Sequence, residues 1–242
     1  MREPRIVAVM PVSGREELFP LTIKRLYQQE GVEMDVVAVC DTLREFGIAI
    51  NSGSLGMTVP RTPEMTLGMK WQRGINAARD LDPDAIMIVG SGNWFTNGWA
   101  KTLFPYLDDY DMVGSEAMYV YQIRQNDQIM IHWNGYHTNS RKGDMLGAGR
   151  LISRRMLDKV DWQIYNTSLN QGLDRSMSKI LQRQGAKTLT LPAGDEYILK
   201  VGSYKWKNIN SFGVLWGSPN ARKVDRPEEI LKNFPEIKEL AG

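Results

Sequence analysis

The stretch RIVAVMPVSGREELFPLTIKRLYQQEGVEMDVVAVC, residues 5–40, decides the fold class of this protein. Its two ends, Arg5–Val12 and Met34–Cys40, are short runs rich in Val and Ile, which is typical of buried strands. Between them, Glu16–Glu30 places Leu and Ile at helical spacing and ends at Gly31. A strand, a helix and a strand joined by short connections predict a right-handed crossover between parallel strands.

Strands and helices continue to alternate downstream. Further strands are expected over Ala85–Val89, Asp111–Ser115, Lys187–Leu191 and the start of Leu151–Leu157, which then turns into a short helix. Further helices are expected over Lys70–Leu81, Gly98–Leu107, Gly172–Gly185 and Glu228–Leu240. This order predicts an α/β fold with a mostly parallel central sheet and flanking helices.

Three other segments depart from the alternation. Residues 42–69 contain several Gly and Pro and predict a loop with at most a short strand, and residues 193–222 predict an irregular segment. Residues 116–145 predict an antiparallel extension, with a turn at Asn126–Asp127. One face of its strands is expected to carry the apolar side chains Tyr119, Tyr121, Ile123, Ile129, Ile131 and Trp133.

The composition is that of an ordinary globular domain. The chain has 242 residues, 42% of them hydrophobic and 24% charged, and this length suits one large α/β domain. Its apolar runs are far shorter than the roughly 18–20 residues of a membrane-spanning helix, and the N-terminus lacks the pattern of a secretory signal. A single cysteine, Cys40, excludes an internal disulfide and a multi-thiolate metal site. We therefore expect a cytoplasmic protein without an integral membrane segment, whose oligomeric state the sequence leaves open.

The net charge of +2 is unevenly distributed along the chain. Residues 1–121 contain 11 basic and 16 acidic residues, whereas residues 122–223 contain 16 basic and 7 acidic residues. The second segment therefore carries a net charge of +9, which fits either a phosphate-bearing partner or a solvated basic face.

Polar residues follow three of the expected strands, where open α/β sheets bind ligands. They are Ser13-Gly14-Arg15, Asp41-Thr42 and Gly90-Ser91-Gly92-Asn93. No dinucleotide-type glycine pattern follows the first strand, and no Gly-Lys-Ser loop of the Walker type occurs. Both absences argue against a dehydrogenase and an ATPase.

Five segments resemble, in order, the nucleotide-sugar glycosyltransferases of the A-type fold, in the broad family 2 group. Arg5–Arg15 resembles their opening strand and nucleotide loop, and Val36–Thr42 resembles the second strand, whose terminal aspartate faces the nucleotide base. The other three are Leu67–Asn76, which resembles the helix start before the metal motif, Asp84–Trp99, which resembles the strand and turn of the Asp-x-Asp motif, and Gly147–Arg155 with Gly172-Leu173-Asp174, which resembles the acceptor side.

The resemblance implies an inverting hexosyltransferase that uses a nucleotide sugar, with uridine diphosphate (UDP) as the expected carrier. It implies a single domain over residues 1–242, with residues 1–115 binding the donor and residues 116–242 forming the acceptor half and the C-terminal helix. The implied donor-binding residues are Pro11, Ser13, Arg15, Asp41, Lys70, Ser91 and Asn93. The implied acceptor-binding residues are Trp94, Arg150 and Arg175, and the implied catalytic base is Asp174.

The sequence departs from the family at the metal motif. Gly92 and Asn93 stand where the family has two carboxylates that bind Mg²⁺ or Mn²⁺. Asn93 can offer only a neutral oxygen, so we expect a weakened metal site. Either Asn93 still binds the metal, or cations such as Arg15, Lys70 and Arg150 stabilise the leaving diphosphate.

Each assignment has a structural alternative. Asp174 could simply cap the helix that it opens, although a carboxylate is also favoured there by the helix dipole. Lys70 and Arg73 stand at a helix start, which favours a phosphate nearby but equally fits an exposed face. Trp71, Trp94 and Trp99 are more often core residues than stacking platforms. The two histidines, His132 and His137, lack a third metal ligand.

The sequence leaves the acceptor open. The resemblance implies either a saccharide or a hydroxymethylated base in DNA, since some viral enzymes of this fold class modify such bases; a viral source would place the protein in the host cytoplasm. Two other functions compete with glycosyl transfer. A nucleotidyltransferase on a similar sheet would need carboxylates for two metals, and a non-catalytic module would bind the nucleotide sugar without transferring it.

Overall fold

The structure is a computed structural model that describes residues 2–60, 62–123, 128–136, 141, 143–203 and 215–240. Its first elements are strand β1 (Arg5–Val12), helix α1 (Phe19–Tyr27) and strand β2 (Glu33–Cys40). β1 and β2 are parallel over eight pairs, from Arg5 opposite Glu33 to Val12 opposite Cys40. The predicted parallel pairing of two strands joined by a helix is confirmed. α1 is shorter than expected, because the Arg15 carbonyl first accepts hydrogen bonds from the amides of Leu18 and Phe19 in a turn.

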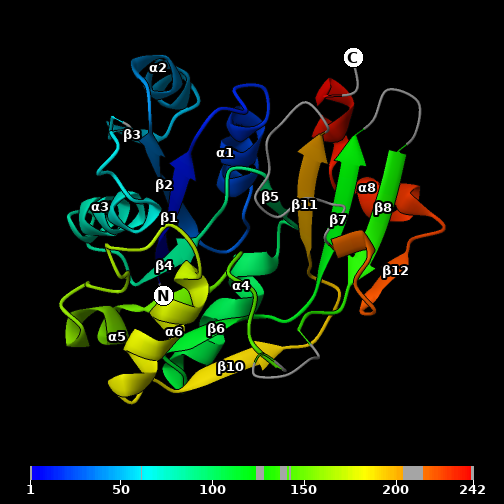
Figure 1. The fold of residues 1–242 in the computed structure, drawn as a ribbon. Coiled ribbons are helices and arrows are strands. Elements are labelled where there is room, and N and C mark those ends of the chain that lie inside the picture. The colour runs from blue at the N-terminus through cyan, green and yellow to red at the C-terminus, as the bar shows by residue number, and fades with distance from the viewer. Residues whose placement is uncertain are drawn as a thin grey trace.

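The main sheet has seven strands in the order β10-β6-β9-β4-β1-β2-β3 (Figure 1). Its other strands are β3 (Leu55–Thr58), β4 (Ala85–Ile88), β6 (Met112–Ser115), β9 (Leu151–Ser153) and β10 (Thr188–Leu191). Only β9 runs antiparallel to its neighbours β4 and β6; all other pairs are parallel. The predicted mostly parallel sheet is therefore confirmed.

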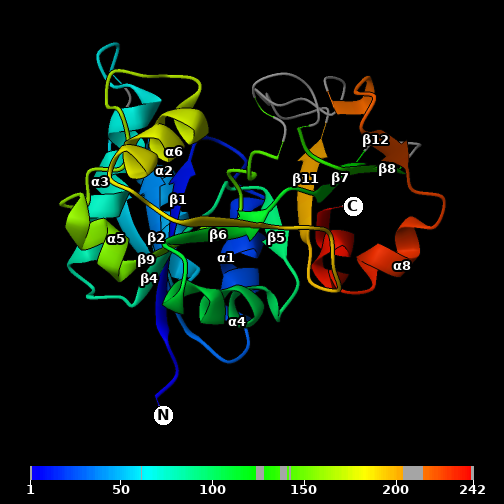
Figure 2. The same ribbon diagram turned by 90° about the horizontal axis from the view of Figure 1, so that it is seen from below.

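Helices cover both faces of the main sheet, as the views in Figures 1 and 2 agree. They are α2 (Leu43–Asn51), α3 (Leu67–Arg79), α4 (Trp99–Leu103), α5 (Arg154–Lys159) and α6 (Leu173–Arg183), with a 3₁₀ helix, η1 (Phe104–Asp108), after α4. Alternate residues of β1 face opposite sides: Ile6 and Met10 pack with α1 and α4, whereas Val7 and Val9 pack with α3, α5 and α6. This two-sided burial explains the continuous apolar runs of the central strands.

A second sheet of five strands, in the order β12-β8-β7-β11-β5, adjoins the first. Its strands are β5 (Asn93–Phe95), β7 (Met118–Ile123), β8 (Gln128–Trp133), β11 (Ile198–Ser203) and β12 (Ala221–Lys223). The C-terminal helix α8 (Pro227–Leu231) and the 3₁₀ helix η3 (Pro235–Leu240) pack on one face of it through Phe234 and Ile237. In the part of the chain that the structure describes, no helix is long and apolar enough to cross a membrane.

Four expectations about elements were wrong: three concern where elements begin and end, and the fourth, treated below, concerns the faces of two strands. Residues 42–69 contain a full helix, α2, and residues 193–222 contain β11 and the start of β12. The expected helix over Glu228–Leu240 is interrupted, because Pro235 cannot continue α8 and starts η3 instead. The turn expected at Asn126–Asp127 lies outside the described residues.

The fourth error concerns the faces of β7 and β8. These strands are antiparallel as predicted, but Tyr121 lies opposite Met130, and Val120 lies opposite Ile131. Tyr119, Tyr121 and Ile123 therefore face one side of the sheet, and Ile129, Ile131 and Trp133 face the other. Because both faces are buried in apolar clusters, the apolar pattern alone could not define one inward side.

Candidate active site

The carboxyl ends of β1 and β2 are tied together by one buried lysine. Lys70 on α3 directs its Nζ to the carbonyl oxygen of Val12 and to Oδ1 of Asp41. Pro11 lies half-buried near the end of β1, and Ser13, which follows the strand, is exposed. The predicted Pro11, Ser13, Asp41 and Lys70 thus do come together. Lys70 is engaged by protein oxygens, however, so it positions Asp41 rather than presenting its charge to a ligand.

Glu45 on α2 organises the same two loops. One carboxylate oxygen accepts a hydrogen bond from the amide of Gly14, and the other accepts from the amides of Asp41 (2.8 Å) and Thr42 (3.1 Å). Thr42 in turn caps α2 by accepting from the Glu45 amide. This reciprocal arrangement is a capping box. Glu45 is only 3% exposed, so it acts as an internal anchor for the loops after β1 and β2.

The turn after β4 is closed by Asn93. The backbone amide of Asn93 donates to the Gly90 carbonyl (2.9 Å), and the side-chain oxygen of Asn93 accepts from the Gly90 amide (2.9 Å). Gly92 in the same turn has no room for a side chain, since a β-carbon would lie 2.9 Å from the carbonyl oxygen of Val201. The β11 strand thus lies against Gly92, where the resemblance leads one to expect a carboxylate.

Two cations lie next to this turn. Nη1 of Arg15 is 3.5 Å from Oγ of Ser91. Lys200 of β11 pairs with Asn93 of β5 across the second sheet. Burial, and then the charge of Arg15, lower the pKa of Lys200 to about 8, against the opposing effect of the Asp174 carboxylate. Burial also lowers the pKa of Arg15. Arg15 and Lys200 thus border the turn after β4 from two different elements.

Asp174 lies in the first turn of α6 but does not cap it. The N-cap residue is Gly172, in a left-handed conformation with φ 68°. The Asp174 carboxylate instead packs against Gly147, where a β-carbon would collide with both carboxylate oxygens. Its charge also opposes the lowering of the Lys200 pKa. This placement disfavours the capping alternative.

The predicted acceptor-binding residues differ in their surroundings. Arg150 is 2% exposed and donates to the carbonyl oxygens of Leu146 and Met145, and to Ser178 of α6. Trp94 is fully buried, and its indole nitrogen donates to Thr22. Direct contact of either side chain with an acceptor is at odds with this geometry. Of the three residues, only Arg175 is exposed.

The residues at the turn do not form a strong metal site. Among the described residues, no three His, Cys, Asp or Glu side chains gather where they could hold a metal ion. Asn93 already uses its side-chain oxygen within the turn, and two cations lie nearby. His132 lies on β8, where burial and the charge of Arg222 lower its pKa; His137 lies outside the described residues. A divalent ion would find mainly neutral or repulsive partners here.

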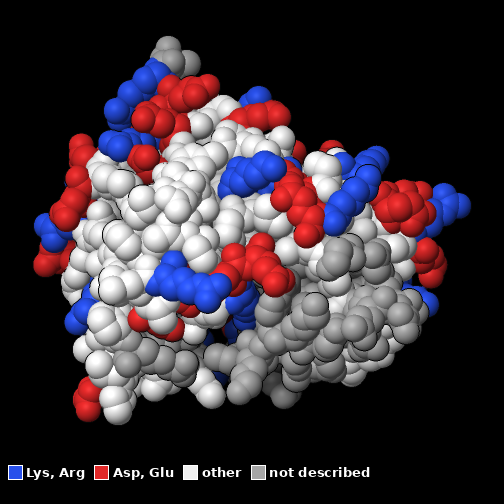
Figure 3. Space-filling view, turned by 90° about the horizontal axis from the view of Figure 1, so that it is seen from above, with Lys and Arg blue, Asp and Glu red and all other residues white. Residues whose placement is uncertain are grey.

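Part of the charge asymmetry along the sequence is neutralised by ion pairs between the two segments. Arg154 and Arg155, from the basic segment, pair with Asp82 and Asp111 of the acidic segment. Figure 3, a view from above, shows acidic and basic side chains interspersed over the described part of this face. The basic segment therefore does not form one continuous basic surface there.

Sequence reasoning missed Glu45 and Lys200. The signal for Glu45 was present, because Thr42-x-x-Glu45 is the pattern of a capping box and announces a helix start. The signal for Lys200 was weaker: apolar Leu199 and Val201 flank it in a short alternation. Its role depends on the pairing of β11 with β5, which joins residues about a hundred positions apart.

No protein-family model matches the sequence, and no curated protein matches it. Solved structures do match the fold. The TarS protein of S. aureus superposes with a TM-score of 0.60 at 15% identity, over 82% of this chain and 37% of TarS. TarS residues 1–349 in complex with UDP-GlcNAc match with a TM-score of 0.59 at 14% identity, over 84% of this chain and 60% of that chain.

A third match is the mannosyltransferase PcManGT of Pyrobaculum calidifontis, solved with GDP-Man and Mn²⁺. Its TM-score is 0.58 at 14% identity, over 98% of this chain and 65% of that chain. This chain thus spans between about a third and two thirds of the length of these proteins. The fold is that of the A-type glycosyltransferases, as the sequence predicted.

Proposed function

We propose that this protein is an inverting glycosyltransferase that moves a sugar from a nucleotide-sugar donor to an acceptor hydroxyl group. The observation that carries the proposal is that Arg15 lies against Ser91 in the turn after β4, Lys200 pairs across the sheet with Asn93 of the same turn, and the charges of Arg15 and Asp174 both act on the pKa of Lys200. A transfer of this kind needs a general base and a stabilised diphosphate leaving group. The UDP-GlcNAc and GDP-Man complexes of proteins with the same fold support this choice.

The donor would bind across the ends of β1 and β2. Pro11, Ser13 and Arg15 would border the nucleotide, and Asp41 would hold its base, which we expect to be uracil. Lys70 keeps Asp41 in place through their ion pair. The amides of Gly14 and Asp41 are held by Glu45, so the pocket would be formed before the donor arrives.

Arg15 and Lys200 would take the part that a metal ion has in relatives with two carboxylates. As the bond between the anomeric carbon and the diphosphate breaks, negative charge grows on the diphosphate oxygens. The ammonium group of Lys200 and the guanidinium group of Arg15, near Ser91 and Asn93, would stabilise that charge. We therefore expect Mn²⁺ or Mg²⁺ to contribute little, with Asn93 as at most a weak ligand.

Asp174 would act as the base. The acceptor oxygen would attack the anomeric carbon from the side opposite the diphosphate, while its proton passes to the Asp174 carboxylate. One C–O bond forms, one C–O bond breaks, and the sugar inverts its configuration. Arg150 would hold the start of α6 through Ser178 and the Asp174 carbonyl, which fixes the base without touching the acceptor.

A saccharide is the acceptor that we favour, ahead of a hydroxymethylated base in DNA. The ion pairs of Arg154 and Arg155 with acidic residues support this order, because a DNA acceptor would call for unneutralised phosphate-binding cations. Arg175 is the exposed residue that we expect near the acceptor.

The decisive experiment measures release of the nucleotide diphosphate from UDP-GlcNAc, UDP-glucose and GDP-mannose, each with EDTA and with Mn²⁺. A thermal-shift assay with the same donors reports binding separately, because a ligand of the folded state raises the melting temperature. We expect a UDP-sugar to bind and to turn over in EDTA. Binding without turnover under all conditions would favour a non-catalytic module, and an absolute requirement for Mn²⁺ would contradict the cationic mechanism.

A further inference from the structure

The first turn of α3 is capped by the loop that leads to Asp174. The first amides of a helix have no acceptor within the helix and need one from outside it. In α3, the amide of Leu67 donates to Oδ1 of Asn170 (2.8 Å), and the amide of Gly68 donates to the carbonyl oxygen of Leu169 (2.9 Å). The loop over residues 166–170 is therefore fixed to the start of the helix.

Thr66 joins the same loop to α3 through its side chain. Its hydroxyl group donates to the carbonyl oxygen of Thr167 and accepts from the amide of Met69 (3.0 Å), so one group both caps the helix and holds the loop. Gly68 makes this close approach possible, because a β-carbon there would collide with the carbonyl oxygen of Asn166. A larger residue at position 68 would have to displace the loop.

One turn further along α3, the buried side chain of Gln72 anchors the chain that enters this loop. Its oxygen accepts from the amides of Ile164 (3.2 Å) and Tyr165 (3.1 Å), and its nitrogen donates to the carbonyl oxygen of Trp162 (2.7 Å). The following residues, 166–172, are mostly exposed. A collision at the start of α3 is therefore relieved most easily by movement of the exposed loop and of the helix start that follows it.

The same turn of α3 also holds the loops of the proposed donor site. Lys70 binds Asp41 and the end of β1, and it is only two residues, about 3 Å along the helix axis, beyond Gly68. On the other side, four residues lead from Asn170 to Asp174 in the first turn of α6. One helical turn thus contacts both the loops after β1 and β2 and the loop that carries the proposed base.

We infer that Thr66 and Gly68 are positioning residues of the transfer reaction, which set where Asp174 lies relative to the donor. The inference rests on the proposed function, in which Asp174 is the base. Displacement of a reacting group by about 1 Å can lower a rate by about 100-fold. Donor binding depends instead on the loops that Lys70 and Glu45 hold, so a change at Thr66 or Gly68 should separate the rate of transfer from the affinity for the donor.

The first test compares two substitutions of a glycine within a helix. We expect Gly68→Ala to lower kcat at least about tenfold and to change the affinity for UDP less than about twofold. Gly47→Ala in α2 is the matched control, because nothing lies within 4 Å of a β-carbon there. It should have the kcat of the wild type.

The second test compares two substitutions of Thr66. Thr66→Val keeps the shape of the side chain but loses both hydrogen bonds of the hydroxyl group, so we expect kcat to fall about fivefold or more. Thr66→Ser keeps the hydroxyl group and should restore kcat to within about twofold of the wild type. In an Asp174→Asn background, Gly68→Ala should cause no further loss, because the group that it displaces is already inactive.

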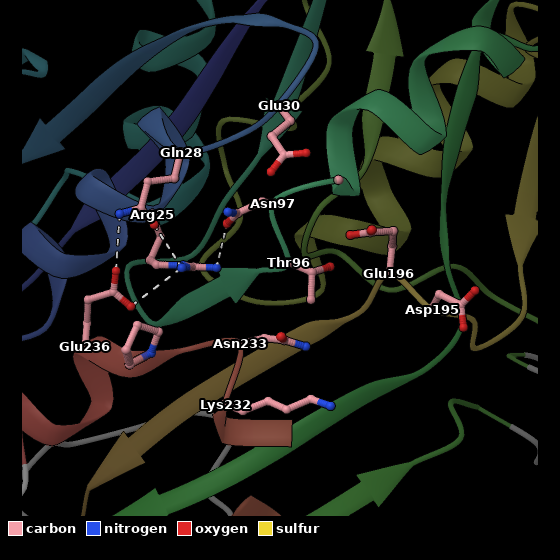
Figure 4. A pocket seen from close by; sticks show the side chains of 12 residues that line it. Arg25, Gln28, Glu30, Thr96, Asn97, Asp195, Glu196, Lys232, Asn233 and Glu236 are labelled. Atoms are coloured by element: carbon pink, nitrogen blue, oxygen red, sulfur yellow. Dashed lines mark hydrogen bonds and ion pairs between the residues drawn. The ribbon is translucent and has the colours of Figure 1, made fainter. Parts of the chain in front are cut away.

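A buried cluster elsewhere in the protein tests whether loss of stability alone lowers the rate (Figure 4). Arg25 of α1 donates to Gln28 (2.9 Å) and lies 3.6 Å from the carboxylate of Glu236 in η3, at the edge of a pocket of about 530 Å³. Glu236→Gln removes one charge of this buried pair and should lower the melting temperature. We expect its kcat, measured well below that temperature, to equal that of the wild type.

Three results would overturn the inference. They are equal kcat in Gly68→Ala and Gly47→Ala, a fall of kcat in Glu236→Gln as large as in Gly68→Ala, and a further loss from Gly68→Ala when Asp174 is already replaced. Failure of the proposed function has a different signature, since the wild type would then release no nucleotide diphosphate from any donor, and the inference would fall with it.

Discussion

Asp174 illustrates how one residue can carry the chemistry of the site. It is not the cap of α6, since Gly172 has that position. We predict that Asp174→Asn keeps the size of the side chain but removes proton acceptance, so that the transfer rate falls by roughly 10²–10⁴ while donor affinity is retained. Initial rates and UDP titrations check this. If the rate is unchanged, another group is the base.

Gly147 determines where the Asp174 carboxylate can lie. A β-carbon at position 147 would collide with both carboxylate oxygens, so we predict that Gly147→Ala displaces the base and lowers the transfer rate at least about tenfold. Gly194→Ala is the matched control, because nothing lies within 4 Å of a β-carbon there. Equal rates in the two variants would mean that the carboxylate position is irrelevant to catalysis.

Lys200 gives the site a measurable pH dependence. Its pKa is lowered to about 8 in the free protein, and a bound diphosphate raises that pKa again because it favours the charged form. Above pH 8, UDP binding must therefore be accompanied by proton uptake. We predict that UDP affinity falls by up to about tenfold per pH unit between pH 8 and pH 9.5. Titration of Lys200→Arg should give a nearly flat profile over that range, and a flat wild-type profile would remove Lys200 from the site.

At the scale of elements, helix α2 supports the loops of the proposed donor site. Glu45 in its first turn accepts three backbone hydrogen bonds from the loops after β1 and β2. We predict that Glu45→Gln lowers the free energy of unfolding by about 1–3 kcal/mol, because at least one buried amide loses its acceptor. UDP affinity should fall as well. Chemical denaturation and UDP titration measure the two effects, with exposed Glu17→Gln as the control. Unchanged stability would show that the loops after β1 and β2 do not depend on Glu45 for their conformation.

The central elements could be predicted from sequence because their burial is uniform. β1 and β2 are buried on both faces, so their apolar runs mark them directly. α2 was missed because Gly and Pro around it obscured its Thr42-x-x-Glu45 signal. β11 was missed for a different reason: Lys200 interrupts its apolar pattern, and only pairing with β5 and β7 shows that this lysine faces the site.

At the scale of the whole molecule, the two sheets draw on both halves of the chain. β9 and β10 complete the first sheet, although they lie beyond residue 115, and β5 from the first half belongs to the second sheet. Ion pairs such as Arg154–Asp82 and Arg155–Asp111 join the acidic and basic segments. A net charge of +9 counted along the sequence is therefore a poor guide to the field that an acceptor meets.

This cancellation leads to a prediction about the acceptor. Because a neutral glycoside makes no phosphate contacts, we expect transfer to simple glycosides to change by less than about twofold between 50 and 200 mM salt. We also expect it to be nearly indifferent to Arg175→Ala. A DNA acceptor held by six or more phosphate contacts would instead lose about 10³-fold in affinity over the same interval. Parallel assays with a glycoside panel and with hydroxymethylated DNA distinguish the two acceptors. Efficient, strongly salt-dependent transfer to DNA that Arg175→Ala weakens would contradict this prediction and favour a polyanionic acceptor.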